Sequence, residues 1–413
     1  MKLIIIILLF TSVLSAKENI SNKNNPKKEI ILINQELNLK TKKEIAKKEK
    51  FYYFNPDKLG VHAFYNPIQF IVEGGLPGNK NLKEVQLLGG FKDLFEELTH
   101  PVSRLNRYGW GKFFYYEFIP HWGKHQNYVP NYVMHTLGGG FRTKLMEEYF
   151  RYNNYKYPKV FAWITMTTMN YFNEATQLAY FRLLSDGEHT GEEFNDIQND
   201  TVDALADVYF FDILGKIIFS FDPVNDFFTK RLHLTEWSYQ SQWNPATNKL
   251  INNGQIYWMR LHIYDKWSVN YTNSVQINAL GLSYEFKKGN YISVGAGANV
   301  SNFFQKTESG DLGLTKDSLN YQFGIYYSID DNPVFLLTYK IGNKQAIKDN
   351  PEFASKFTDI IYFNVYPGWI KGFNYGINFS YQKEAFFVGI TSGSSPIGFI
   401  FSTPQKKMFI ESH

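Results

Sequence analysis

The middle of the chain carries acidic, basic and imidazole side chains at spacings that would place them on one face of a helix. Residues three, four or seven positions apart lie on one side of an α-helix. One stretch has a stripe of four aspartates: Asp196, Asp200, Asp203 and Asp207. The stretch before it has Thr167, Asn170, Glu174 and Gln177 at similar spacing. The first stretch offers Asn131, His135, Gly139 and Arg142.

An imidazole beside carboxylates supports two kinds of chemistry. His135, Glu174 and Asp203 could form an acid–base site, because burial and like-charge pairing move pKa values towards working pH. The same stripes could bind a divalent cation, for which carboxylates supply oxygen ligands. The sequence contains no Gly-x-Ser-x-Gly elbow to provide a nucleophile.

The interpretation that we favour from the sequence is structural. An unpaired buried charge is costly, so polar stripes on otherwise apolar helices are expected to meet and pair. We predict one polar cluster that docks three helices, made of Asn131, His135, Arg142, Glu174 and the aspartates Asp196, Asp200, Asp203 and Asp207. This interpretation predicts no bound metal, no cofactor and no enzymatic activity.

Three helices are expected to position these residues. The first spans 131–152 and is interrupted at Gly138-Gly139-Gly140, the second spans 158–184, and the third spans 196–219. They form a helical segment within 126–222. Residues 51–125 form an aromatic-rich lead-in, for which strand and interfacial-helix segments are expected.

After residue 223 the dominant pattern is alternation of apolar and polar residues, which is typical of strands with one apolar face. It is clearest in 290–300, 319–329 and 373–382. Further strands are expected at 231–243, 255–264, 275–287, 333–341, 359–366, 384–391 and 397–402. These are about ten strands, most of them long enough to cross a membrane at a tilt.

We therefore predict a mixed, mainly β fold: an antiparallel transmembrane β-barrel of about 8–12 strands with an inserted segment of three helices. In such a barrel one strand face meets lipid and the other meets a polar interior. Gly, Ser and Asn alternate with Ile, Phe and Tyr here, which favours this arrangement over a soluble β-sandwich.

The N-terminus indicates export. Lys2, an apolar run and small residues before Lys17 resemble a cleaved signal peptide over 1–16. Residues 17–50 hold ten Lys and five Glu and no aromatic residue, which predicts a disordered tail. The chain has no Cys, which excludes disulfides and thiolate chemistry. The expected location is the outer membrane of a Gram-negative-type cell, where nucleic acid is not an expected partner.

Residues 131–215 resemble an uncharacterised family of bacterial outer-membrane proteins, a domain of unknown function. The likeness rests on Asn131, Tyr132, His135, Gly139, Glu174, Asn195, Asp196, Asn199 and Thr201. The chain departs from that pattern at Thr136, where the family has Pro, and at Asp203-Ala204, where it has a Gly pair. The resemblance implies an outer-membrane barrel with a helical portion and no known chemistry.

Two function classes follow from these observations. In the first, the helices brace or plug a barrel that serves a structural or passive-transport role. In the second, His135 and the carboxylates act on acyl esters in an outer-membrane lipid-modifying enzyme. The expected partners are outer-membrane lipid and the barrel-assembly machinery. The sequence does not indicate the oligomeric state, substrate or physiological role.

Overall fold

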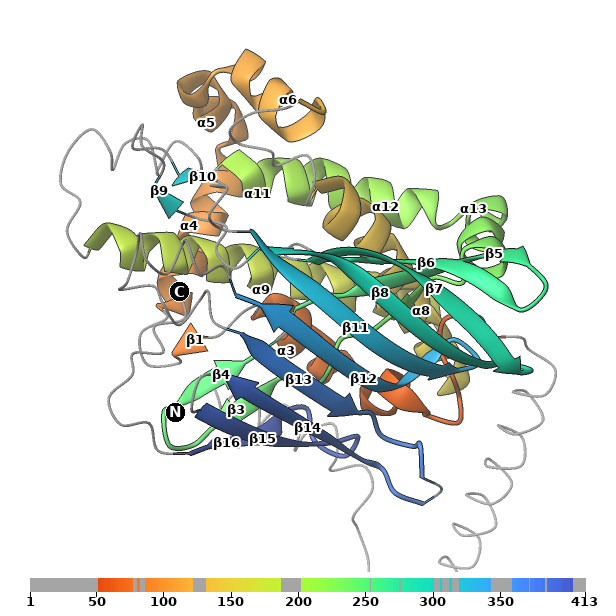
Figure 1. Ribbon diagram of the computed structural model, residues 1–413. Helices are drawn as coiled ribbons and strands as arrows, with labels where there is room; N and C mark the ends of the chain where they lie inside the picture. The colour runs from red at the N-terminus through yellow and green to blue at the C-terminus, as the bar shows by residue number, and fades with distance from the viewer. Residues whose placement is uncertain are drawn as a thin grey trace, which may run out of the picture.

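A single large sheet with helices packed on one of its faces makes up most of the molecule (Figure 1). The computed structural model describes residues 51–76, 80–81, 86–121, 131–186, 202–252, 254–274, 277–300, 305–306, 312–313, 319–342, 359–370, 372–382 and 385–403. The expected signal peptide and the tail at 17–50 therefore lie outside the described residues. The chain is a mixture of helix and strand, with a 14-stranded, mostly antiparallel sheet.

Ten consecutive strands of that sheet form an antiparallel meander, as the alternation predicts. They are β5 (Tyr257–Tyr264), β6 (Trp267–Asn273), β7 (Ile277–Lys287), β8 (Asn290–Val300), β11 (Leu319–Ile329), β12 (Asn332–Ile341), β13 (Ile360–Val365), β14 (Tyr375–Gln382), β15 (Ala385–Ser392) and β16 (Gly398–Ser402). Two further short strands, β9 (Gln305–Lys306) and β10 (Leu312–Gly313), pair with each other in a separate sheet. The sequence-based interpretation missed β6.

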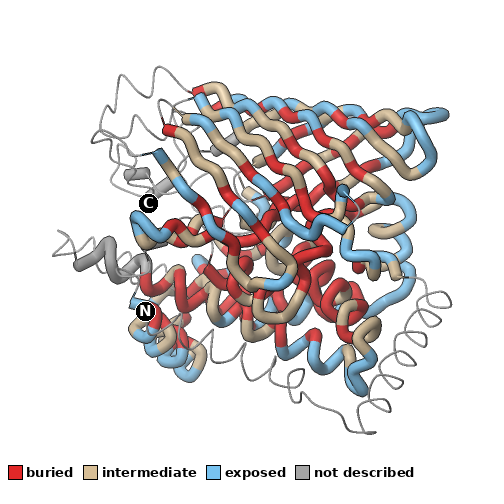
Figure 2. Tube along the Cα trace, turned by 90° about the horizontal axis from the view of Figure 1, so that it is seen from below, coloured by how far each residue is buried: buried red, intermediate tan, exposed pale blue. Residues whose placement is uncertain are grey.

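The two faces of the meander differ in polarity. On β7 and β8, Ser283 and Ser293 face each other and are buried, whereas Leu282 and Val294 are 46% and 52% exposed. The same parity holds on β11, where Asn320 and Gln322 are buried and Tyr321 and Phe323 are exposed. Figure 2 shows this alternation of buried and exposed positions along the strands. We call the buried, mostly polar face the inner face.

The prediction of one continuous strand at 231–243 is wrong. Two short strands form instead, β2 (Thr235–Glu236) and β3 (Gln242–Asn244), and they lie next to opposite ends of the meander. β2 pairs with β5 at one end of the meander, and β3 pairs in parallel with β16 at the other. The segment 235–244, which we call the strap, thus joins the two ends. Beyond β3, β4 (Lys249–Ile251) and β1 (Lys80–Asn81) complete the sheet, which is not closed.

Three helices pack on the inner face: α3 (Pro67–Gly75), α8 (Gly139–Tyr152) and α9 (Pro158–Asp186). Phe70, Phe141 and Met169 from these helices share one hydrophobic core with Tyr257 and Tyr326 from the strands. Figure 1 shows the helices behind the sheet. The core therefore lies between the helices and the strands.

The remaining helices extend this layer. They are η1 (Gly60–Phe64), α4 (Leu87–Thr99), α5 (Pro101–Tyr108), α6 (Trp110–Phe118), η2 (Asn131–Gly138), α11 (Asp203–Ala206), η4 (Asp207–Phe211), α12 (Asp212–Ile218), α13 (Asp222–Asp226) and η5 (Phe227–Arg231). Elements η2, η4 and η5 are π-helices. Among the helices that the structure describes, none combines the length and apolarity of a membrane span.

The expected interruption at Gly138–Gly140 does not occur, because η2 runs directly into α8. Gly140 is needed there for close packing rather than for a break. A Cβ atom at Gly140 would lie 2.7 Å from the carbonyl oxygen of Gly215 on α12, and one at Gly215 would lie 2.4 Å from the carbonyl oxygen of Thr136. The two helices therefore cross with their backbones almost in contact.

Candidate functional site

His135 lies in a buried cluster of acidic side chains where η2, α9 and the α11–η4–α12 segment meet. Its Nδ1 lies 3.0 Å from Oδ1 of Asp212, and its Nε2 lies 3.3 Å from Oδ2 of Asp207. Glu174 on α9 is 2% exposed and completes the group. One potential ligand atom from each of His135, Glu174 and Asp207 lies within 4.8 Å of the other two. A single metal ion could bind between them.

A π-helix brings the two aspartates to the same histidine. Asp207 is the first residue of η4, and Asp212 follows its last residue. Five residues along a regular α-helix turn by about 500°, which would place the two carboxylates on different sides. The i→i+5 repeat of a π-helix returns residue i+5 close to the side of residue i. His135 itself lies in the second π-helix, η2.

Three further carboxylic acids surround this group. Asp203 shares a hydrogen bond with Glu117 of α6, and Glu117 also accepts a hydrogen bond from Nδ2 of Asn131 at 2.9 Å. Glu97 of α4 is 2% exposed and interacts electrostatically with Glu174 and Asp203. Glu97, Glu117 and Asp212 were not expected from the sequence. Glu97 and Glu117 lie on α4 and α6, outside the three-helix segment 126–222 to which the predicted cluster was confined. Asp212 is out of register with the α-helical spacing of the other aspartates.

The electrostatics of the cluster favour bound protons or a bound cation. Burial raises the pKa of Glu174 to about 8, and it also raises the pKa values of Glu97, Asp203 and Asp207. Burial alone would lower the pKa of His135. The hydrogen bond and charge of Asp212, with the charges of Glu174 and Asp203, raise it to about 9. At neutral pH the imidazole is therefore protonated, and several carboxyl groups keep their protons, unless a cation replaces those protons.

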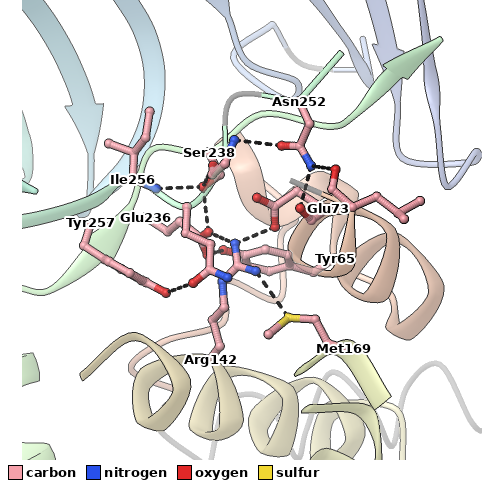
Figure 3. Close-up of polar contacts among 12 residues, drawn as sticks. Tyr65, Glu73, Arg142, Met169, Glu236, Ser238, Asn252, Ile256 and Tyr257 are labelled. Carbon is pink, nitrogen blue, oxygen red and sulfur yellow. Dashed lines mark hydrogen bonds and ion pairs between the residues drawn. The ribbon is translucent and has the colours of Figure 1, made fainter. Parts of the chain in front are cut away.

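Arg142 does not join this cluster, contrary to the sequence-based prediction. It is fully buried and contacts carboxylate oxygens of Glu73 on α3 and Glu236 on the strap (Figure 3). Glu236 also accepts hydrogen bonds from Tyr65 at 3.1 Å and from Ser238 at 2.7 Å. Burial raises the pKa of Glu73 to about 8 in spite of Arg142, so at neutral pH the carboxyl group of Glu73 keeps its proton. The side chains join α3, α8 and the strap.

The remaining predicted site residues are placed as follows. Asn131 binds Glu117 at the edge of the His135 cluster. Asp196 and Asp200 lie outside the described residues. The proposed catalytic residues His135 and Glu174 do lie together, with Asp203 close enough to raise the pKa of both. The histidine side chain is 11% exposed, which describes an enclosed site rather than an open cleft.

A second histidine–aspartate pair lies elsewhere. Nδ1 of His233 is 2.9 Å from Oδ2 of Asp331, and the other oxygen of that carboxylate contacts Arg260 of β5. Both His233 and Asp331 line a cavity of about 180 Å³. The positive guanidinium neutralises this aspartate, so the pair has no excess of acidic groups.

No family model, curated protein or solved structure matches this chain.

Proposed function

We propose that this protein is an exported outer-membrane protein in which the meander β5–β16 contacts lipid and the helices brace the polar inner face. The observation that carries the proposal is the polarity of the sheet. Its solvent-exposed face is apolar, and its covered face is mostly polar outside the core that packs on the helices. This is the reverse of the arrangement expected for a water-soluble sheet.

The exposed face supports this proposal by its extent. Large apolar side chains follow one another across neighbouring strands: Leu280, Leu282, Ile292, Val294, Tyr321, Phe323, Ile325, Tyr339, Ile361, Ile377, Tyr381, Ile390, Phe399 and Phe401. Tyr321 is 71% exposed and Leu280 is 63% exposed. An apolar surface that continues over so many strands favours contact with a membrane or a partner over contact with water.

The inner face supports it by its internal hydrogen bonds. Nδ2 of Asn270 donates to Oγ of Ser283 at 2.9 Å, and Ser283 and Ser293 share a hydrogen bond of 2.7 Å. Nε2 of Gln242 on the strap donates to Asn378 at 2.5 Å. These amides and hydroxyls form the polar interior that a transmembrane sheet requires.

The strap favours the closed form of barrel that the sequence predicts. Unpaired strand edges are not tolerated in hydrocarbon. Pairing of β2 with β5 and of β3 with β16 gives both end strands of the meander a partner in the same short segment. In this proposal the strap and the helices beneath it complete the wall, and the Glu73–Arg142–Glu236 group anchors them. Outer-membrane lipid and the barrel-assembly machinery are the proposed partners.

Adjacent residues with opposite orientation provide the test. The natural chain has no Cys, so Leu282→Cys and Val294→Cys report on the apolar face, and Ser283→Cys and Ser293→Cys report on the inner face. In isolated outer membranes, a lipid-soluble maleimide should label the first pair and spare the second. A membrane-impermeant maleimide should label none of the four until the protein is denatured. Rapid labelling of positions 282 and 294 by the impermeant reagent, or recovery in the soluble fraction, would refute the proposal.

A further inference from the structure

We infer that His135, Glu174 and Asp207 bind one divalent transition-metal ion. Potential ligand atoms of these three side chains converge to within 4.8 Å of one another, although the residues come from three different helices. The inference does not depend on membrane insertion, because the residues lie on helices and their metal content can be measured wherever the protein fractionates.

The histidine ring is oriented as a metal ligand. Metal-binding imidazoles generally donate their other N–H to a carboxylate, a backbone carbonyl or water, which fixes the tautomer and the ring plane. Asp212 is the hydrogen-bond acceptor here, with its Oδ1 at 3.0 Å from Nδ1 of His135. Nε2 is then directed towards Asp207, whose Oδ2 lies 3.3 Å away. Asp212 is therefore a positioning residue rather than a ligand.

The charges in the cluster are not balanced by the described protein groups. Six carboxylic acids gather there: Glu97, Glu117, Glu174, Asp203, Asp207 and Asp212. The cations beside them include His135 and Lys216, whose amine donates to Thr167 at 3.0 Å. Arg104 also interacts with Glu97. The acids still outnumber these cations, and an uncompensated buried carboxylate is strongly unfavourable, so the surplus carboxyl groups must hold either protons or a bound cation.

One carboxylate oxygen at the centre of the cluster also lacks a hydrogen-bond partner. Asp207 is 1% exposed, and its Oδ1 is buried with no hydrogen-bond donor in reach among the described residues. A structural ion pair, in which protonated His135 bridges Asp207 and Asp212, leaves this oxygen without a partner, whereas Glu174 accepts a hydrogen bond from Nδ2 of Asn173 at 3.1 Å. A divalent cation bound between the three side chains would supply the missing positive charge and a partner for the Asp207 carboxylate.

The donor set indicates the class of metal. One imidazole nitrogen with two carboxylates suits Mn²⁺, Fe²⁺ or Zn²⁺, whereas Ca²⁺ and Mg²⁺ prefer oxygen ligands alone. Three protein ligands would leave a position for water, as in catalytic rather than structural zinc sites. This proposal replaces our sequence-based prediction that no metal is bound.

The test uses full-length protein purified without a histidine tag, stripped with a chelator and titrated with Zn²⁺ or Mn²⁺. We expect one ion per chain, with Ca²⁺ a poor competitor. Glu174→Gln and Asp207→Asn, which preserve side-chain shape, should abolish stoichiometric binding. Asp212→Asn should weaken it by about 10–100-fold, as loss of a supporting carboxylate generally does. His233→Gln is the matched control, since His233 also bonds an aspartate, and it should bind as the natural protein does.

Two outcomes would overturn the inference. If Asp207→Asn and Glu174→Gln are folded and retain the ion, the metal is an adventitious ion only. If the natural protein binds no ion at micromolar concentration and gives no Co²⁺ absorption band typical of nitrogen and oxygen ligands, the site does not exist. This second measurement requires no variant, so it decides the question even where a variant fails to fold.

Discussion

At the scale of single residues, Arg142 holds together parts of the chain that are far apart in sequence. Its guanidinium bonds carboxylates from α3 and from the strap, and it lies 4.7 Å from the centre of the Phe70 ring. Removal of one member of a buried ion pair leaves the other charge uncompensated, at a cost of about 3–5 kcal/mol.

We therefore expect Arg142→Met to lower the free energy of unfolding by about 3–5 kcal/mol. Arg151→Met is the control, because that arginine pairs with Glu147 at a position where its side chain is 38% exposed. The control should change stability by no more than about 1 kcal/mol. Urea titration of the purified protein measures both, and equal stability of the two variants would show that Arg142 does not anchor the strap.

Glu148 should make stability depend on pH. It accepts hydrogen bonds from the backbone of Tyr52, Tyr53 and Phe54, but burial outweighs them and raises its pKa from 4.5 to about 7. Between these two pH values the unfolded state has lost the proton that the folded state keeps. The contribution of Glu148 to stability is therefore present below pH 4.5 and declines as the pH rises to 7, by at most about 1.4 kcal/mol per pH unit.

Comparison of the natural protein with Glu148→Gln between pH 4.5 and 8 isolates this effect. The difference in unfolding free energy between them should shift steadily in favour of the variant up to about pH 7 and then level off. A difference that stays constant over this range would mean that burial does not control the titration of Glu148.

The sequence identifies part of the candidate site and not the rest, for reasons that lie in the helices. His135, Glu174, Asp203 and Asp207 follow α-helical spacing, and the structure brings them together. Asp212 could not be found in the same way, because a π-helix shifts it onto the side of Asp207. The spacing of Arg142 and His135 predicts that they share a helical face. In the structure Arg142 pairs instead with Glu73 and Glu236, which come from distant segments of the chain.

At the scale of elements, the crossing of α12 over η2 sets the distance between His135 and Asp212. Gly215 permits that crossing, because any Cβ atom there would meet the backbone of Thr136 at 2.4 Å. Rigid backbone cannot yield as a flexible side chain does, so even a methyl group must push the helices apart.

Gly215→Ala should destabilise the protein by about 1–3 kcal/mol, a typical cost of overpacking. Gly111→Ala on α6 is the control, since no atom of the described part of the chain lies within 4 Å of its Cβ position. There the higher helix propensity of Ala should raise stability by up to about 1 kcal/mol. Thermal or urea unfolding measures both changes, and a neutral Gly215→Ala would mean that the two helices do not cross as closely as described.

The strands were easier to predict than the strap because they obey a local rule. A strand with one buried face repeats every two residues, and that repeat is visible in β8 and β11 without knowledge of their neighbours. Residues 234–242 are all buried, since both sides of the strap are covered. The sequence of the strap nonetheless alternates, with Trp237 and Tyr239 between Glu236, Ser238 and Gln240, so it resembles that of an ordinary strand and does not reveal that both sides are covered.

At the scale of the whole molecule, the apolar outer surface predicts how charge is tolerated. Val294 lies in the middle of β8 and is 52% exposed, whereas Tyr264 ends β5 and is 76% exposed. In a bilayer, an arginine at the midplane costs about 2–4 kcal/mol, and one near the interface costs about 0–1 kcal/mol. In water, both positions would accept it.

Val294→Arg should thus reduce folding into phospholipid vesicles far more than Tyr264→Arg does. The readout is the free energy of folding into those vesicles, with heat-modifiable migration on gels as a check of the folded fraction. Equal and small effects of the two substitutions would contradict a lipid-facing position for Val294.

The strap also constrains the order in which the chain can fold. β2 pairs with β5, which is close to it in the sequence. Gln242 of β3, in contrast, cannot pair with Gly398 of β16 until that much later residue has been synthesised. Contacts of such long range carry a large loop-closure entropy and form slowly. A folding intermediate with an exposed β3 edge is therefore expected during assembly. Such an edge would be both a site for chaperone protection and a site for aggregation.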